Sequence, residues 1–150
     1  MANQGRFLFV KTSFMAYIKH TFMSIAQHLE VGKRGEALAE AFLREQGYTI
    51  LGRNIANPLG KRLGEIDIVA EKRHSIVFVE VKTLKLPTGK APYLPEHQVT
   101  RSKLLKLERI AAYYLRNHGL GERAYRFDVI AVTLMEGQEP EIRHIEHAFL

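Results

Sequence analysis

The sequence predicts an α/β domain in which a mixed central β-sheet is flanked by helices. Three observations support this fold class. Helical patterns over about 32–46 and 96–117 are interspersed with strand patterns along the chain. The strand patterns are short and rich in β-branched residues. The second helix lies between two strands, and such a crossover connection is how a parallel pair of strands usually forms.

The first helix is expected over about 32–46, because Leu38, Ala41 and Phe42 recur there at helical spacing. Gly47 stands where this helix would stop, since glycine readily adopts the left-handed conformation that ends helices.

Three strands are expected next, over about 48–55, 64–71 and 75–82. Only the polar turn at 72–74 separates the last two, so they should form an antiparallel hairpin. The following segment, 84–95, is predicted to be a loop because it contains Pro87, Gly89, Pro92 and Pro95.

The second helix, over about 96–117, has a buried stripe that is made of Leu104, Leu107, Ala111, Tyr114 and Leu115. Strands over about 125–134 and 141–149 complete the predicted sheet. The whole chain has 150 residues, of which 46% are apolar and 25% charged, and this composition is typical of a globular domain.

The composition also excludes several classes of site. The sequence contains no cysteine, which excludes disulfides, thiolate zinc sites, iron–sulfur clusters and cysteine nucleophiles. The formal charge of +6 is a weak indication of a polyanionic partner such as nucleic acid.

Residues 1–31 differ from the rest and are predicted to be an N-terminal extension to a domain over 32–150. They contain no run of about 20 apolar residues that could span a membrane, and no convincing secretory signal. We therefore expect a cytoplasmic protein without a membrane partner. One interpretation is an over-long start, with initiation at Met23. The other is a basic amphipathic helix that contacts a membrane or a partner.

A cluster of charged residues is expected at one end of the predicted hairpin. Glu80 and Lys82 are two residues apart and share a face of their strand. Pairing through the turn can place Asp67 beside them, although a slip of one residue would reverse its face. Two carboxylates can hold a magnesium ion, and an ammonium can offset phosphate charge. An ordinary pair of surface charges remains the alternative interpretation.

Several motifs together resemble a known family. Gly64-Glu65-Ile66-Asp67, then twelve residues, then Glu80-Val81-Lys82 is similar to the PD-(D/E)xK nuclease motif. More closely, the chain resembles the YraN-type family of bacterial proteins from about Gly32 to Phe149. This resemblance includes Gly35-Glu36, Gly47-Tyr48, Arg53-Asn54, Phe78-Val79, Lys103 and Arg126-Phe127-Asp128-Val129.

The resemblance implies a restriction-endonuclease-like fold with an α-β-β-β-α-β core. It also implies that Asp67 and Glu80 bind Mg²⁺ or Mn²⁺, that Lys82 is the catalytic lysine, and that Glu36 approaches the metal. A first-turn glutamate favoured by the helix dipole is the alternative for Glu36. Asp128 would support the site from a neighbouring strand or pair with Arg126.

The positive charge is concentrated beside this predicted site. Residues 85–109 contain six basic and two acidic side chains, a net charge of +4. We expect phosphate contacts from the following residues: Lys85, Lys90, Arg101, Lys103 and Lys106. The alternative is an ordinary solvated helix face.

The predicted function is that of a metal-dependent endonuclease that hydrolyses phosphodiester bonds, with branched or recombination and repair DNA as the suggested substrate. The alternative is a nucleic-acid-binding or adaptor protein that keeps the nuclease fold with weak catalysis. Related resolvases act as dimers, so a homodimer is a further expectation from the resemblance.

Overall fold

The computed structural model describes residues 5–57, 60, 64–87 and 101–148. Side chains are described from Ser24 onward, except those of Ile25 and Arg101.

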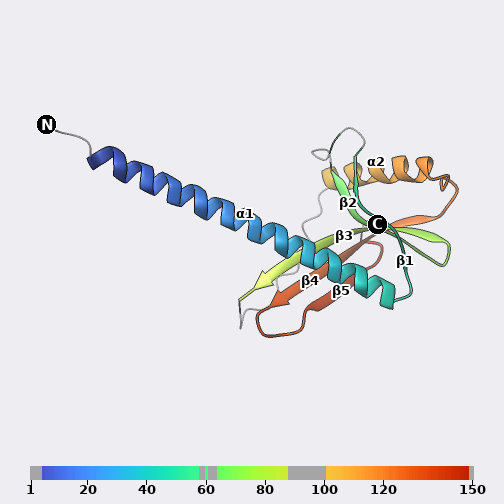
Figure 1. The fold of residues 1–150 in the computed structure, drawn as a ribbon. Helices are drawn as coiled ribbons and strands as arrows, with labels where there is room; N and C mark the ends of the chain where they lie inside the picture. The colour runs from blue at the N-terminus through green and yellow to red at the C-terminus, as the bar shows by residue number, and fades with distance from the viewer. Residues whose placement is uncertain (1–4, 58–59, 61–63, 88–100, 149–150) are drawn as a thin grey trace.

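Within the described residues, five strands form one mixed sheet at the centre of the molecule (Figure 1). The strands lie side by side in chain order, and they are β1 (Thr49–Ala56), β2 (Glu65–Lys72), β3 (Ser75–Leu86), β4 (Tyr125–Met135) and β5 (Glu141–Ile145). Strands β3 and β4 are parallel, and the other neighbouring pairs are antiparallel. This arrangement confirms the predicted fold class, hairpin and parallel pair.

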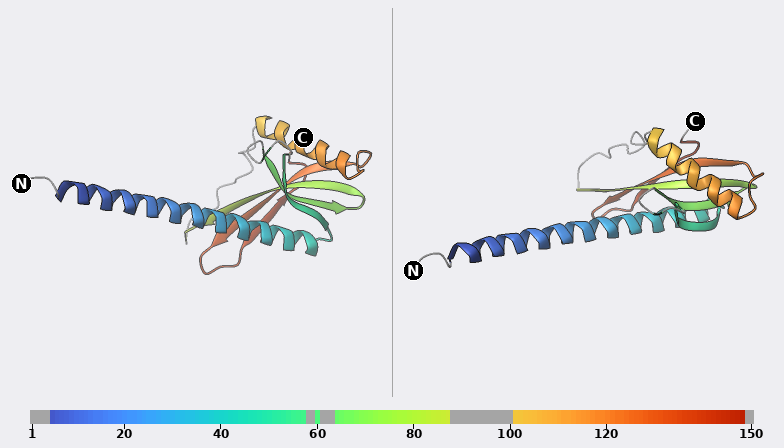
Figure 2. Two further views of the ribbon diagram at one scale, coloured as in Figure 1. Left: turned by 45° about the horizontal axis from the view of Figure 1, so that its top comes forward. Right: turned by 90° about the horizontal axis from the view of Figure 1, so that it is seen from above.

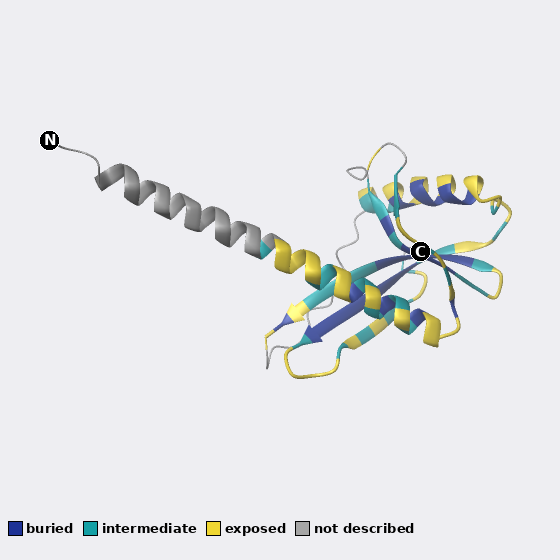
Figure 3. Cartoon of the chain, in the orientation of Figure 1, coloured by how far each residue is buried: buried dark blue, intermediate teal, exposed yellow. Residues whose placement is uncertain are grey.

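Helices α1 (Gly5–Glu45) and α2 (Arg101–Asn117) lie on opposite faces of the sheet (Figure 2). The core between α1 and the sheet contains Leu43, Tyr48, Ile68, Val77, Val79 and Ile130. The core between α2 and the sheet contains Val69, Ile76, Phe78, Leu107, Ile110 and Tyr114. Because both faces are covered, β3 and β4 are buried along most of their length (Figure 3).

The ends of two strands differ from the sequence prediction. Strand β3 continues to Leu86, because its last residues pair with β4 up to Met135. The predicted loop over 84–95 therefore starts later, and most of it lies outside the described residues, as does the predicted helix start at 96–100. Strand β5 ends at Ile145, and a turn follows it.

Helix α1 is much longer than the predicted helix over 32–46. It runs without interruption from Gly5 through Gly32 to Glu45, and its N-terminal part extends well beyond the sheet (Figure 1). No proline occurs in this segment to break the hydrogen-bonding pattern, and each of the two interior glycines, Gly32 and Gly35, is tolerated in a helix at a cost of about 1 kcal/mol. No helix in the described part of the chain is long and apolar enough to cross a membrane.

Helix α1 lies close against β3 at Gly35. A Cβ atom placed on Gly35 would lie 1.8 Å from Oγ1 of Thr83, so only glycine fits here without a shift of the helix or the strand. The adjacent Glu36 is close enough to the end of the β2–β3 hairpin for its charge to act on Asp67.

Candidate active site

The β2–β3 ladder ends just before the two predicted metal ligands. Its last pair is Ile68 with Val79, and the same register would place Asp67 opposite Glu80. There, Oδ2 of Asp67 accepts a hydrogen bond from the backbone N–H of Val81 at 2.6 Å. The carboxylate therefore takes the place of a ladder bond, and both carboxylates lie at one end of the hairpin as predicted.

Glu80 is buried, with 7% of its surface exposed, on the face of β3 that also bears Ile76 and Phe78. Its Oε1 accepts a hydrogen bond from Nζ of Lys82 at 2.5 Å. The same oxygen accepts one from Nζ of Lys103, which comes from α2. Two ammonium groups therefore neutralise one buried carboxylate, as a charge in this position requires.

The carboxyl group of Asp67 is largely buried and is influenced by two other carboxylates. Burial raises the pKa of its carboxyl group to about 7, and the negative charges of Glu80 and Glu36 contribute to this increase. The hydrogen bond from Val81 and the charge of Lys82 act in the opposite direction. The influence of Glu36 shows that α1 supplies a third carboxylate to the surroundings of Asp67.

The two lysines differ in pKa although they share Glu80. Burial alone would lower the pKa of Lys82, but its contact with Glu80 outweighs burial and raises it. For Lys103, burial lowers the pKa, and the charge of Lys82 lowers it further, against the opposing effect of Glu80.

The oxygen donors at this end of the hairpin fit a magnesium or manganese ion held by two carboxylates. Such ions are commonly bound by one or two carboxylates together with water and substrate oxygens. Burial and the repulsion from Glu80 both raise the pKa of Asp67, and a divalent cation between Asp67 and Glu80 would relieve that repulsion. Among the described residues, no group of three or more histidine, cysteine, aspartate or glutamate side chains is arranged to hold a metal ion.

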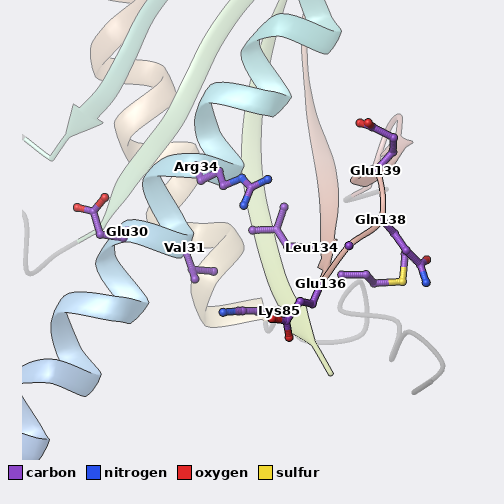
Figure 4. Close-up of a pocket in the computed structure, with 10 residues that line it drawn as sticks. Glu30, Val31, Arg34, Lys85, Leu134, Glu136, Gln138 and Glu139 are labelled. Atoms are coloured by element: carbon purple, nitrogen blue, oxygen red, sulfur yellow. The ribbon is translucent and has the colours of Figure 1, made fainter. Parts of the chain in front are cut away.

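The predicted phosphate-binding residues do not all lie together. Lys103 contacts Glu80, and Lys106 is exposed on α2. Lys85 projects to the α1 face instead, where it lines a pocket of about 670 Å³ with Arg34 (Figure 4). The alternation of side chains explains this, since Lys85 is an odd number of residues from Lys82. Lys90 and the side chain of Arg101 lie outside the described residues.

A second charged cluster surrounds Asp128 on the α1 face of the sheet. Asp128 has no exposed surface and accepts hydrogen bonds from Nε of Arg126 at 2.9 Å and from the backbone N–H of His147 at 3.0 Å. Nε2 of His144 is 2.8 Å from Oδ2 of Asp128. We refer to Asp128, Arg126, His144 and His147 as the Asp128 cluster.

Sequence reasoning anticipated the pair of Asp128 with Arg126 but did not identify His144 as a further partner. The side chain of His144 is only 10% exposed. The pairing of β5 with β4 brings His144 to this position, opposite Ile130, and no sequence pattern indicates that strand order.

Comparison with known proteins shows which family the chain matches. Residues 35–132 match the model of a family described as "Uncharacterised protein family UPF0102". The chain belongs to the UPF0102 family. This confirms the resemblance to YraN-type proteins, and the matched range contains Asp67, Glu80, Lys82 and Lys103.

Individual relatives support this membership over most of the domain. A UPF0102 protein of Moorella thermoacetica is 48% identical over 69% of this chain and 80% of its own length. One from Syntrophotalea carbinolica is 41% identical over 82% of this chain and 94% of its own. One from Rhodococcus jostii is 37% identical over 83% of this chain and its full length.

Proposed function

We propose that this UPF0102 protein is a metal-dependent DNA endonuclease that hydrolyses phosphodiester bonds. The observation that most supports this proposal is the meeting of Asp67, Glu80 and Lys82 at one end of the β2–β3 hairpin. This combination of residue types suits the hydrolysis of a phosphodiester, where negative charge develops on the attacked phosphate.

In this proposal, Asp67 and Glu80 hold the divalent cation, with Glu36 adding negative charge from α1. When bound, the cation would supply charge stabilisation and a water of lowered pKa. The ammonium of Lys82 lies against Glu80, where it can offset charge on a phosphate or orient a water molecule. The hydrogen bond from Val81 fixes the carboxylate of Asp67 in place.

The basic residues of α2 are proposed to bind the DNA backbone. Lys106 and Arg109 are exposed on this helix, which packs over the face that bears Glu80. Contacts of this kind give affinity without sequence recognition and weaken with salt. Branched and recombination or repair DNA is the substrate class to test first, because the resemblance to junction resolvases suggests it, and a homodimer is the form in which symmetric junctions would be cut.

The decisive experiment is a cleavage assay with Mg²⁺ or Mn²⁺ on four-way junctions, flaps, single strands and linear duplexes. Wild-type protein should cut at least one of these substrates, and Lys82→Ala should lose about 10²-fold or more of that activity. Lys72→Ala is the matched control, since Lys72 lies at the opposite end of the hairpin, over the ring of Tyr48. Absence of metal-dependent cleavage on every substrate would contradict the proposal.

A second candidate is a nucleic-acid-binding or adaptor protein with weak catalysis. The observation that favours it is that Oε1 of Glu80 already holds two ammonium groups. Such a protein would bind DNA with a steep salt dependence and give no product with either metal. Binding that is unchanged in Asp67→Asn, together with the absence of cleavage, would support this candidate over the nuclease.

A further inference from the structure

The ion pair between Lys103 and Glu80 is the feature that the proposed function leaves unexplained. Lys103 was predicted to contact a phosphate, yet its Nζ binds Oε1 of Glu80, 23 residues away in sequence. The role of this lysine is considered on the basis of the proposed metal site at Asp67 and Glu80.

Lys103 occupies an unusual position on α2. It lies four residues before Leu107 and seven before Ile110, so it belongs to the side of the helix that faces the sheet. Only 33% of its side chain is exposed. A partly buried lysine on an apolar helix face is unfavourable unless its charge is paired. Glu80 supplies that pairing.

Two ammonium groups on one carboxylate oxygen repel one another. Lys82 and Lys103 both contact Oε1 of Glu80, and neither is fully solvated. A divalent cation that binds to Glu80 would be a third cationic group at the same place, and it would carry two further positive charges. Coulomb repulsion at such short range, in a partly buried site, is too large to leave all three groups in position.

Lys103 is the group that can leave. Lys82 is on β3, two residues from Glu80 and on the same face, so the strand keeps the two side chains adjacent. Lys103 approaches from a different element, and rotation of its flexible stem moves the ammonium away without disturbing the sheet.

We propose that Lys103 is a positioning residue that stands in for the divalent cation. It neutralises Glu80 in the metal-free protein and competes with the cation for that carboxylate. Once released, its ammonium lies at the border between the site and the basic surface of α2, where a substrate phosphate can replace Glu80 as its partner.

Calorimetric titration of Mn²⁺ without DNA tests this competition. Lys103→Met should bind Mn²⁺ about tenfold more tightly than wild type, because the competing charge is gone. Arg116→Met is the matched control, since Arg116 is exposed at the other end of α2 and its loss changes the net charge equally. The control should change the affinity by less than about twofold. An affinity in Lys103→Met that is unchanged or weaker would overturn the inference.

Glu80→Gln and Asp67→Asn separate this inference from the proposed function. If both variants bind Mn²⁺ as wild type does, the metal site itself is wrong. If both lose binding while Lys103→Met behaves as wild type does, the site stands and the role of Lys103 is wrong.

Labelling of lysine amines in the wild-type protein provides a second measurement that needs no folded Lys103 variant. Addition of Mn²⁺ should increase the acetylation rate of Lys103, read by peptide mass spectrometry, while exposed Lys106 serves as the internal reference. In Glu80→Gln, Lys103 should react rapidly even without metal. If Mn²⁺ leaves the acetylation rate of Lys103 unchanged or lowers it, the inference is overturned.

Discussion

Two aspartates of the central sheet have opposite surroundings. Asp128 on β4 has no exposed surface, and its carboxylate contacts Arg126, His144 and the backbone N–H of His147. Asp67 on β2 has one backbone donor but also faces the charges of Glu80 and Glu36. The first carboxylate is stabilised as an anion by the fold, and the second is destabilised by it.

The pKa values express this difference. Burial alone would raise the pKa of Asp128, but the hydrogen bonds from His144, Arg126 and the N–H of His147 together lower it below the ordinary value. For Asp67, burial and repulsion raise the pKa to about 7. We infer that the Asp128 cluster stabilises the packing of the strands. A buried carboxyl group with a raised pKa, such as that of Asp67, is instead typical of a functional site.

The largest expected effect is on stability at the Asp128 cluster. Asp128→Ala should lower the free energy of unfolding by about 3–5 kcal/mol, because it removes the fully buried acceptor that Arg126, His144 and the N–H of His147 share. Urea denaturation monitored by circular dichroism measures this loss. Glu71→Gln is the control, since it breaks a more exposed ion pair with Arg123 and should cost only about 0–1 kcal/mol. Equal losses in the two variants would remove the distinction between the Asp128 cluster and ordinary ion pairs.

The pH dependence of the same cluster has a definite sign. The folded-state pKa of Asp128 is below its unfolded value, so its contribution is present at neutral pH and is lost as the pH falls through the lowered pKa. Asp128→Asn should therefore lose stability less steeply in acid than wild type does. A variant with the wild-type acid profile would contradict this assignment.

Metal binding should increase the stability of the protein through Asp67 and Glu80 and not through the Asp128 cluster. At a concentration about 100 times the dissociation constant, Mg²⁺ or Mn²⁺ should stabilise wild-type protein by about 2.7 kcal/mol. Thermal unfolding at pH 8, with and without a chelator, measures this gain. Asp67→Asn and Glu80→Gln should show none of it. A gain that survives in both variants would place the metal elsewhere.

A smaller effect of opposite sign is expected when Asp67 is made neutral. Asp67→Asn should stabilise the metal-free protein by about 1–2 kcal/mol at pH 8.5, because it removes a repelled carboxylate and Asn can still accept the hydrogen bond from Val81. The folded-state pKa is raised, so the contribution of Asp67 is present below its unfolded pKa and is lost as the pH rises through about 7. The gain should accordingly decrease as the pH falls below 7, and it should be absent only below the unfolded pKa of the carboxyl group. Destabilisation at pH 8.5 would show that Asp67 is a structural anion like Asp128.

The sequence was sufficient for those parts of the site that depend on local pairing. The short turn between β2 and β3 fixes the hairpin register, so the proximity of Asp67 and Glu80 could be predicted. The contact between Lys103 and Glu80 could not, because it depends on how α2 packs across the sheet. Local periodicity does not determine that packing.

The sequence predicted neither the full Asp128 cluster nor the full length of α1, and the reasons are related. The role of His144 depends on the position of β5 beside β4, which is a choice of strand order rather than a sequence pattern. The start of α1 at Gly5 was missed because residues 5–31 lack a regular core-facing pattern, although nothing in their composition opposes a helix.

The hydrogen bond between Val81 and Asp67 makes one backbone amide a spectroscopic reporter of the site. The N–H of Val81 donates to the side-chain carboxylate of Asp67 rather than to a backbone carbonyl of β2, at the point where the β2–β3 ladder has ended. Its nuclear magnetic resonance shift will therefore follow the charge on that carboxylate, whether a proton or a cation changes it. A single amide signal in the isolated protein can report occupancy of the site before any substrate is known.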